Sequence, residues 1–177
     1  SSEQTKDTIE DSYLETLHLL EAHLDEERPY LFGGRPAFAD FGLAAQLYEC
    51  GSDPTPGAIL REEAPRTAAW VERMLAPEAR GAFEAREALL PTLEPLLGRQ
   101  VGRLFLPWTL ANARALEDGE ESLAVDLDGR PWTQAPQKYH AKSLGALRRR
   151  YAAVAGRSHL DPVLERTGCR DALEAAA

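Results

Sequence analysis

The stretch that decides the fold runs from Leu24 to Leu43 and reads LDEERPYLFGGRPAFADFGL. Its first part contains Pro29 and the pair Gly33-Gly34, which end a helix and form a turn. Its second part places Asp40 three positions after Ala37. If Ala37 caps a helix, the Asp40 carboxylate accepts a hydrogen bond from the Ala37 N–H and faces the positive helix end. We therefore expect a helix, a turn and a second helix, with Asp40 as a folding residue rather than a catalytic one.

Helical periodicity continues on both sides of this stretch. On its N-terminal side, apolar residues at spacings of four, three and four predict an amphipathic helix that begins near Thr8. These residues are Tyr13, Leu17, Leu20 and Leu24. On its C-terminal side we expect a helix over about 38–49, turn chemistry over 51–57, and a third helix that begins at Pro65, buries Trp70 and ends at Pro77.

Residues 14–74 resemble the core of the glutathione transferase C-terminal domain. In that family a helix ends in a turn like Pro29-Tyr30-Leu31-Phe32-Gly33, and the next helix opens with a Ser/Thr-x-x-Asp capping box. A Pro-led helix with an inward Trp follows, as Pro65 and Trp70 do here. Ala37 departs from the pattern, because it has no side-chain oxygen for the forward capping bond.

The resemblance implies an all-α helical bundle of the glutathione transferase C-terminal type, to which we assign residues 1–80. In this family the helical domain supplies much of the pocket for an electrophilic substrate, and a preceding thioredoxin-like domain binds glutathione. The sequence has no strand–helix pattern of a thioredoxin-like domain, and the first helix of the family's helical domain is missing or shortened. We therefore expect no cofactor in this chain, glutathione only where a thioredoxin-like domain is joined to it, and no activity of the chain alone. The implied partners are that domain, a small hydrophobic or electrophilic ligand and, in a homodimer, a second copy.

The second half, residues 81–177, is predicted to be a helical extension packed on the same domain. Its first part, 83–117, is helical and contains Pro91, Pro95 and Pro107, each of which begins or kinks a helix, so two or three pieces are expected. Alternating apolar residues then lead to Asp128-Gly129, a strong hairpin turn pair, and predict a small β-hairpin near 122–134. A helix over about 136–155 and a short one between Asp161 and Gly168 complete the prediction.

Composition excludes several classes of function. The chain of 177 residues has a formal net charge of −9, which disfavours binding to nucleic acid. No apolar run approaches the length of a membrane span, so no membrane association is expected. Cys50 and Cys169 lack the spacing of a metal site, and we expect no metal, two free thiols and a cytoplasmic location.

No motif specifies a reaction, and no residue is predicted to be catalytic. The strongest candidate for substrate binding is the group of large polar-tipped side chains around the hairpin. Its members are Trp108, Asn112, Trp132, Tyr139 and His140, with Gln134 beside them. Such side chains can orient an aromatic or thiol-bearing ligand, or they can anchor the hairpin on the helices, and His140 can act as a base or bond a backbone carbonyl.

The remaining titratable groups on the first helix are expected to face solvent. This applies to His18, His23 and the acidic face. The acidic face comprises Glu10, Asp11, Glu15 and Glu21. The leading function is thus the substrate-side helical domain of a glutathione-transferase-like protein. The alternatives are a non-catalytic ligand-binding or interaction module and a self-contained enzyme that uses the Trp132–His140 region.

Overall fold

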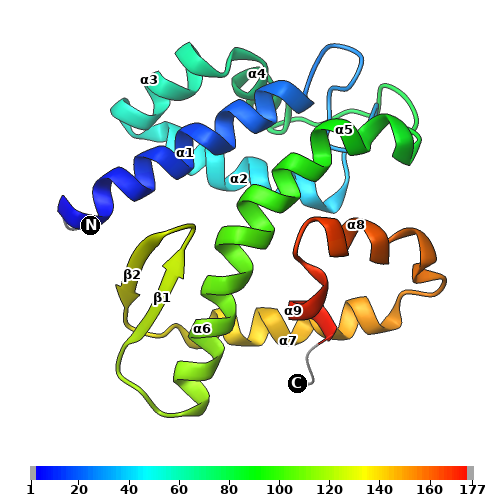
Figure 1. Ribbon diagram of the computed structural model, residues 1–177. Coiled ribbons are helices and arrows are strands. Elements are labelled where there is room, and N and C mark those ends of the chain that lie inside the picture. The colour runs from blue at the N-terminus through cyan, green and yellow to red at the C-terminus, as the bar shows by residue number, and fades with distance from the viewer. Residues whose placement is uncertain (1–2, 175–177) are drawn as a thin grey trace. The chain divides into compact units, whose positions relative to one another are not determined.

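The computed structural model describes residues 3–174, so residues 1–2 and 175–177 of the two predicted domains lie outside it. The fold is helical with one small antiparallel hairpin, as predicted (Figure 1). The chain divides into two compact units, one ending at Leu93 and the other beginning at Glu94. The stretch 81–93 therefore belongs with the first unit and not with the predicted extension.

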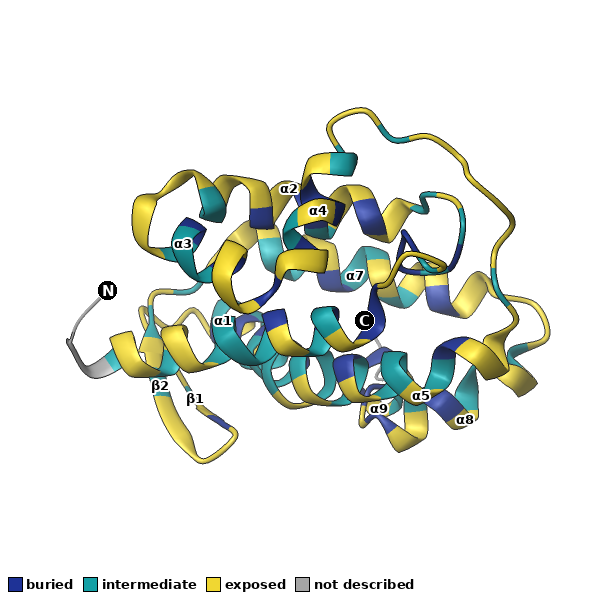
Figure 2. Ribbon diagram, turned by 90° about the horizontal axis from the view of Figure 1, so that it is seen from above, coloured by how far each residue is buried: buried dark blue, intermediate teal, exposed yellow. Residues whose placement is uncertain are grey.

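The first unit consists of four helices and the start of a fifth. These are α1 (Glu3–His23), α2 (Phe38–Ser52), α3 (Pro54–Glu63), α4 (Pro65–Arg73) and the first part of α5 (Arg86–Leu96). The helices α1, α3 and α4 pack on one another, and α2 packs on α3 and α4 (Figure 1). On α4, Thr67, Trp70 and Val71 are buried, whereas Ala69 and Glu72 face solvent (Figure 2).

Two predicted boundaries in this unit were wrong. Thr8 does not cap α1, because the helix already begins at Glu3 and nothing between Glu3 and Thr8 breaks it. The predicted turn over 51–57 is short, and α3 begins at Pro54 with Asp53 as its N-cap residue. The physical reason is that proline at the first helical position needs no N–H partner and has a helical φ, so Asp53-Pro54 begins a helix.

The centre of the first unit is the buried carboxylate of Asp40. As predicted, Ala37 is the N-cap of α2, and its N–H donates to Oδ2 of Asp40 over 2.8 Å. The other carboxylate oxygen, Oδ1, accepts from the N–H of Leu31 at 2.8 Å and from the indole Nε1 of Trp70 at 3.1 Å. One fully buried side chain therefore connects the turn before α2, the first turn of α2 and the interior face of α4.

The turn that precedes α2 is closed by a strap of backbone over residues 78–84. Tyr30 and Gly33 exchange two hydrogen bonds of 3.1 Å, and the Glu84 N–H donates to the Phe32 carbonyl at 2.9 Å. Gly33 has a φ of +121°, and a Cβ there would lie 2.6 Å from the Glu84 nitrogen. Only glycine combines this φ with so close a backbone approach, which explains the position of the Gly-Gly pair.

A buried polar network joins the end of α1 to the start of α5. The ring of His23 lies 2.8 Å from the Leu31 carbonyl through Nε2 and 2.7 Å from Oγ1 of Thr92 through Nδ1. Because a carbonyl can only accept, Nε2 carries the hydrogen in the neutral ring. Beside it, Arg28 binds both carboxylate oxygens of Glu84 and donates to the His23 carbonyl. The expectation that His23 faces solvent was wrong, since its side chain is completely buried.

Glu21 also departs from the predicted solvated acidic face. Its carboxylate accepts hydrogen bonds from the backbone N–H groups of Arg66 and Thr67 at 3.1 and 2.9 Å, in the first turn of α4. Burial raises the pKa of Glu21, but the hydrogen bonds from Thr67 and Arg66 outweigh burial and hold the pKa below its ordinary value. A side chain of α1 thus caps α4, whose own N-cap residue, Ala64, has no oxygen to do so.

The second unit begins within a long helical stretch. After α5 come a π-helical segment, η1 (Leu97–Phe105), and α6 (Leu106–Glu117), and the stretch has no break from Arg86 to Glu117. The predicted prolines therefore do not divide it into separated helices. Pro95 and Pro107 flank the wider π segment, so the change of helical pattern falls between two residues that cannot donate a backbone hydrogen bond.

The remaining elements pack around α6. They are β1 (Leu123–Leu127), β2 (Arg130–Gln134), α7 (Lys138–Ala153), the single 3₁₀ turn η2 (Arg157–His159), α8 (Asp161–Arg166) and α9 (Arg170–Glu174). The predicted hairpin is confirmed, with Asp128 and Gly129 at φ values of +55° and +83° in its turn. The helix α6 contacts β1 and α7, and α7 contacts α9 (Figure 1). A small core of Leu106, Cys169 and Ala172 joins α6 to the C-terminal helices.

Replacing Asp40 by alanine is expected to lower the free energy of unfolding by about 3 kcal/mol or more, because it leaves three N–H donors without their acceptor in a dry site. Urea denaturation measures this change. Asp53→Ala is the matched control, since Asp53 is exposed and makes no side-chain cap bond. Equal effects of the two substitutions would mean that the Asp40 contacts do not determine stability.

Stability is expected to fall as the pH drops below 6.5, the ordinary pKa of histidine. Burial lowers the pKa of His23. The hydrogen bond to Leu31 raises this pKa, and the positive charge of Arg28 lowers it further. The unfolded chain then takes up a proton that the folded chain resists, so the stabilisation is complete above pH 6.5 and is lost as pH falls towards the lowered pKa.

Thermal melts of the wild type and of His23→Gln between neutral and acidic pH test whether His23 causes the loss of stability. The variant should lose less stability on acidification than the wild type does. The control His18→Gln should keep the wild-type pH dependence, because His18 is exposed on the same helix. A His23→Gln profile parallel to the wild-type profile would show that another group causes the acid sensitivity.

Candidate functional site

Two of the predicted site residues share one amide in the second unit, and a third contacts one of them. The indole N–H groups of Trp108, on α6, and Trp132, on β2, both donate to Oε1 of Gln134, at 3.1 and 2.8 Å. The His140 ring meets Trp108 edge-on, with 4.9 Å between ring centroids and an interplanar angle of 87°. Both indoles are half-buried, so the two rings are fixed by their shared acceptor while part of each remains exposed.

The other two predicted residues have different surroundings. Asn112 is fully buried, and its side chain bonds both the N–H and the carbonyl of Gln137 at 2.6 and 3.0 Å. It therefore positions the backbone that leads into α7. Tyr139 is 77% exposed, with its ring 6.2 Å from that of His140. A substrate-binding role for the five residues stays a prediction, although Asn112 already uses its amide on the backbone.

His140 is half-buried at the first turn of α7. Within residues 3–174, neither of its ring nitrogens has a hydrogen-bond partner, and no carboxylate orients the ring. The predicted alternative in which His140 bonds a backbone carbonyl is thus not observed. Both nitrogens are therefore available to a ligand, and no carboxylate fixes which of them carries the hydrogen.

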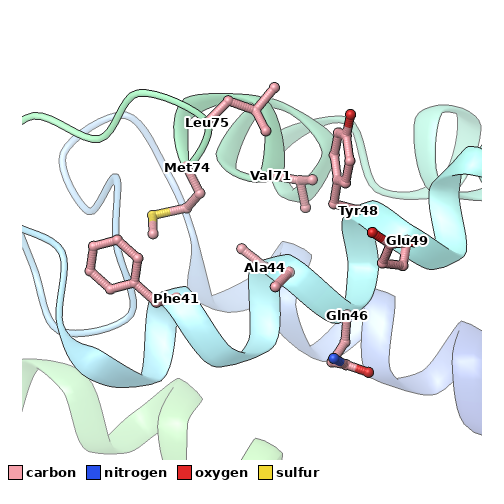
Figure 3. Close-up of a pocket in the computed structure, with 9 residues that line it drawn as sticks. Phe41, Ala44, Gln46, Tyr48, Glu49, Val71, Met74 and Leu75 are labelled. Carbon is pink, nitrogen blue, oxygen red and sulfur yellow. The ribbon is translucent and has the colours of Figure 1, made fainter.

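An apolar groove in the first unit was not predicted. It lies between α2 and the end of α4, and its volume is about 460 Å³. The side chains of Phe41, Ala44 and Tyr48 on α2 face Val71 and Met74 across it (Figure 3). Leu75 also lines the groove. The side chains of Leu75 and Phe41 are 60% and 52% exposed.

The chemistry of the groove is that of an apolar contact surface. Ala45, Gln46 and Glu49 complete the lining, and Gln46 points away from the groove in Figure 3. Glu49 is its one charged side chain, and no Lys or Arg is among the described lining residues. The groove can hold an apolar or aromatic body, and it has no cationic group for a carboxylate.

One sequence signal could have identified this groove. Phe41, Ala44 and Tyr48 repeat at spacings of three and four. Ala44 is buried, as Asp40 and Leu47 are, whereas the flanking Phe41 and Tyr48 are 52% and 46% exposed. A helix that is apolar on more than one face has a second surface to cover. The partner wall from α4 could not be recognised in this way, because it depends on how the two helices pack.

No metal centre is indicated, since no three His, Cys, Asp or Glu side chains within residues 3–174 are grouped to hold an ion. Over the same residues, no helix combines the length and apolar character that a bilayer crossing requires. Cys50 and Cys169 are both free thiols, as predicted. Burial raises the pKa of the Cys169 thiol, and the interaction with the Thr167 side chain only partly offsets this, so Cys169 is a poor nucleophile.

Comparison with protein families matches residues 3–73 to the family described as glutathione S-transferase, C-terminal domain. Residues 3–73 belong to this family. The resemblance predicted from the turn, Asp40, Pro65 and Trp70 is confirmed, and the helical fold agrees with it. Comparisons with curated proteins and with solved structures found no match.

The glutathione S-transferase C-terminal domain contains most of the apolar groove. Of the groove residues, Met74 and Leu75 alone lie beyond the matched segment. The predicted cluster around Gln134 lies wholly outside it, in the second unit. The family assignment therefore applies to the groove, and it says nothing of the function of the aromatic cluster.

His140→Ala is expected to lower the free energy of unfolding by about 1 kcal/mol or less, because the half-buried ring makes no hydrogen bond and only an edge-on contact with Trp108. Trp132→Ala should cost about 2 kcal/mol, since it removes a large half-buried ring and its bond to Gln134. Urea denaturation of both variants distinguishes a side chain that stabilises the fold from one that does not. An equally large loss for His140→Ala would identify His140 as packing and remove it from the candidate site.

Proposed function

We propose that this chain supplies the substrate-side helical domain of a glutathione-transferase-like protein, which conjugates a thiol to an electrophile when a thioredoxin-like domain is joined to it. The observation that carries the proposal is the apolar groove between α2 and α4, which lies almost entirely within the segment matched to the family. In this assignment the groove takes the apolar body of a hydrophobic electrophile.

Glutathione itself does not fit this groove. The tripeptide carries two carboxylates, and its recognition calls for cationic side chains or clustered backbone N–H donors. The groove instead offers Glu49, whose negative charge repels a carboxylate, and an apolar wall. We therefore assign glutathione binding to a thioredoxin-like partner domain, and we expect the chain by itself to be inactive.

The two free cysteines support a cytoplasmic location for the protein, because reduced thiols persist in a reducing compartment. A non-catalytic binding module is the competing assignment. It would use the same groove without any thiol chemistry, so the groove and glutathione have to be tested separately.

Titration of the purified chain with 1,3-dinitrobenzene, a small uncharged aromatic compound, tests the groove. Binding should be saturable, and Phe41→Ser should weaken it about fivefold, because half of a phenyl ring loses its apolar contact. Ile9→Ser is the matched control, since Ile9 is 45% exposed on α1 and lies outside the groove. Binding that is indifferent to Phe41→Ser would show that the probe occupies another place.

Calorimetry with glutathione tests whether the glutathione site lies in a partner domain and not in this chain. No saturable heat is expected in the micromolar range for the isolated chain. Micromolar binding would overturn the assignment of the glutathione site to a partner domain. Activity that appears when a thioredoxin-like domain is joined would favour the transferase, whereas groove binding without any such activity would favour the binding module.

A further inference from the structure

The apolar groove between α2 and α4 contains one charged side chain, Glu49, which no contact within the fold explains. The backbone carbonyl of Glu49 accepts a hydrogen bond from Ser52, but within residues 3–174 its carboxylate has neither a hydrogen bond nor an ion pair. A charged group in the lining of an apolar groove selects between ligands, because it favours one sign of charge over the other.

A second groove, in the second unit, differs in this respect. It lies between η1 and the end of α8, and its charged lining residues are Arg99, Arg103, Glu165 and Arg166. Arg166 already binds the carboxylate of Glu94, and Glu165 lies 3.4 Å from Nη1 of Arg170. The charges of that groove are therefore used within the fold, whereas the charge of Glu49 is not.

The position of Glu49 on α2 strengthens the negative potential at this end of the groove. Glu49 lies near the C-terminus of the helix, where the backbone carbonyls carry partial negative charge, and the last turn of α2 contains no basic residue to offset it. The first unit has the same sign: it contains most of the 29 Asp and Glu residues but fewer than half of the 20 Lys and Arg residues. A cation is therefore attracted to this end of the groove, and an anion is repelled.

An aromatic ring lies beside the carboxylate. Figure 3 shows Tyr48 and Glu49 at one end of the groove, with Phe41 and Met74 at the other end. The face of an aromatic ring attracts a cation, and a ring next to a carboxylate is a common arrangement for holding an ammonium group. The groove thus has an apolar end and an end suited to a cation.

We infer that the ligand of this groove is a hydrophobic cation, in which an apolar body carries a protonated amine or a quaternary ammonium group. This inference rests on the proposed function, since it names the class of hydrophobic compound that the groove takes. The body lies against Phe41, Val71 and Met74, and the cationic group lies beside Tyr48 and Glu49. Phe41 and Glu49 are separated by about 12 Å of helix, which sets the distance that the ligand has to span.

Titration of the purified chain at neutral pH with three compounds of one carbon skeleton tests this inference. The probes are 4-phenylbutylammonium, the neutral 4-phenylbutanol and the anionic 4-phenylbutanoate. The ammonium compound should bind about threefold or more tightly than the alcohol, and the carboxylate should bind most weakly. Sodium chloride should reduce the preference for the cation, because Glu49 is exposed and its charge is screened by salt.

Substitutions of Glu49 locate the source of the preference. Glu49→Gln should weaken binding of the ammonium compound about threefold and leave binding of the alcohol within about twofold of the wild type. Glu49→Lys should reverse the order, so that the carboxylate binds more tightly than the ammonium compound. The matched control is Glu62→Gln, because Glu62 is an exposed glutamate on α3 outside the groove, and it should keep the wild-type preference.

The outcomes separate this inference from the proposed function. If the three probes bind equally well and Phe41→Ser weakens all of them, the groove holds an apolar ligand but does not select a cation, and the inference alone fails. If none of the probes binds saturably, the groove is not a ligand site and both fail. A preference for the cation that survives Glu49→Gln, or that Glu62→Gln reduces as much, would also overturn the inference, because the cation would then be held elsewhere. Melting curves establish that each variant is folded.

Discussion

The carboxylate of Asp40 is the interaction on which the first unit depends. It receives hydrogen bonds from the backbone of the turn, from the N-cap residue of α2 and from the indole of Trp70, and it is completely buried. Burying a carboxylate costs free energy unless its oxygens accept hydrogen bonds. Here three N–H groups donate to them, and the positive end of α2 also stabilises the carboxylate. Removing any of these partners would leave the buried carboxylate with fewer hydrogen bonds, so the turn, α2 and α4 stabilise one another.

The strap over residues 78–84 extends this dependence to the start of α5. The Arg28–Glu84 ion pair and the bond between His23 and Thr92 each join residues more than 50 positions apart, and the second ring bond of His23 connects them to Leu31 in the turn that Asp40 holds. This network explains why the first compact unit continues to Leu93, beyond the matched segment that ends at residue 73. The apolar groove on α2 and α4 therefore belongs to a unit that these long-range hydrogen bonds hold together.

Each of the two units contains a groove, and the two grooves differ in the polarity of their linings. The groove of the first unit is apolar with one charged residue, a glutamate, in its lining, whereas that of the second unit is lined by three arginines and one glutamate among smaller residues. The aromatic cluster around Gln134 is a third feature, in which rigid indole rings accompany an imidazole without a hydrogen-bond partner among the described residues. The family match covers most of the first of these surfaces and neither of the other two.

The sequence by itself determined the features that depend on neighbouring residues. The cap at Asp40, the glycine at a φ of +121° and the hairpin turn at Asp128-Gly129 all follow from local backbone chemistry, and so does the inward face of α4 that carries Trp70. Only the tertiary structure decided that His23 is buried against Thr92, that Glu21 caps a helix 45 residues away, and where the two grooves lie. The physical reason is that helical periodicity specifies which face of a helix is apolar but not which element covers it. The partner of a charged or polar side chain distant in the chain is fixed by packing, and no spacing rule encodes it.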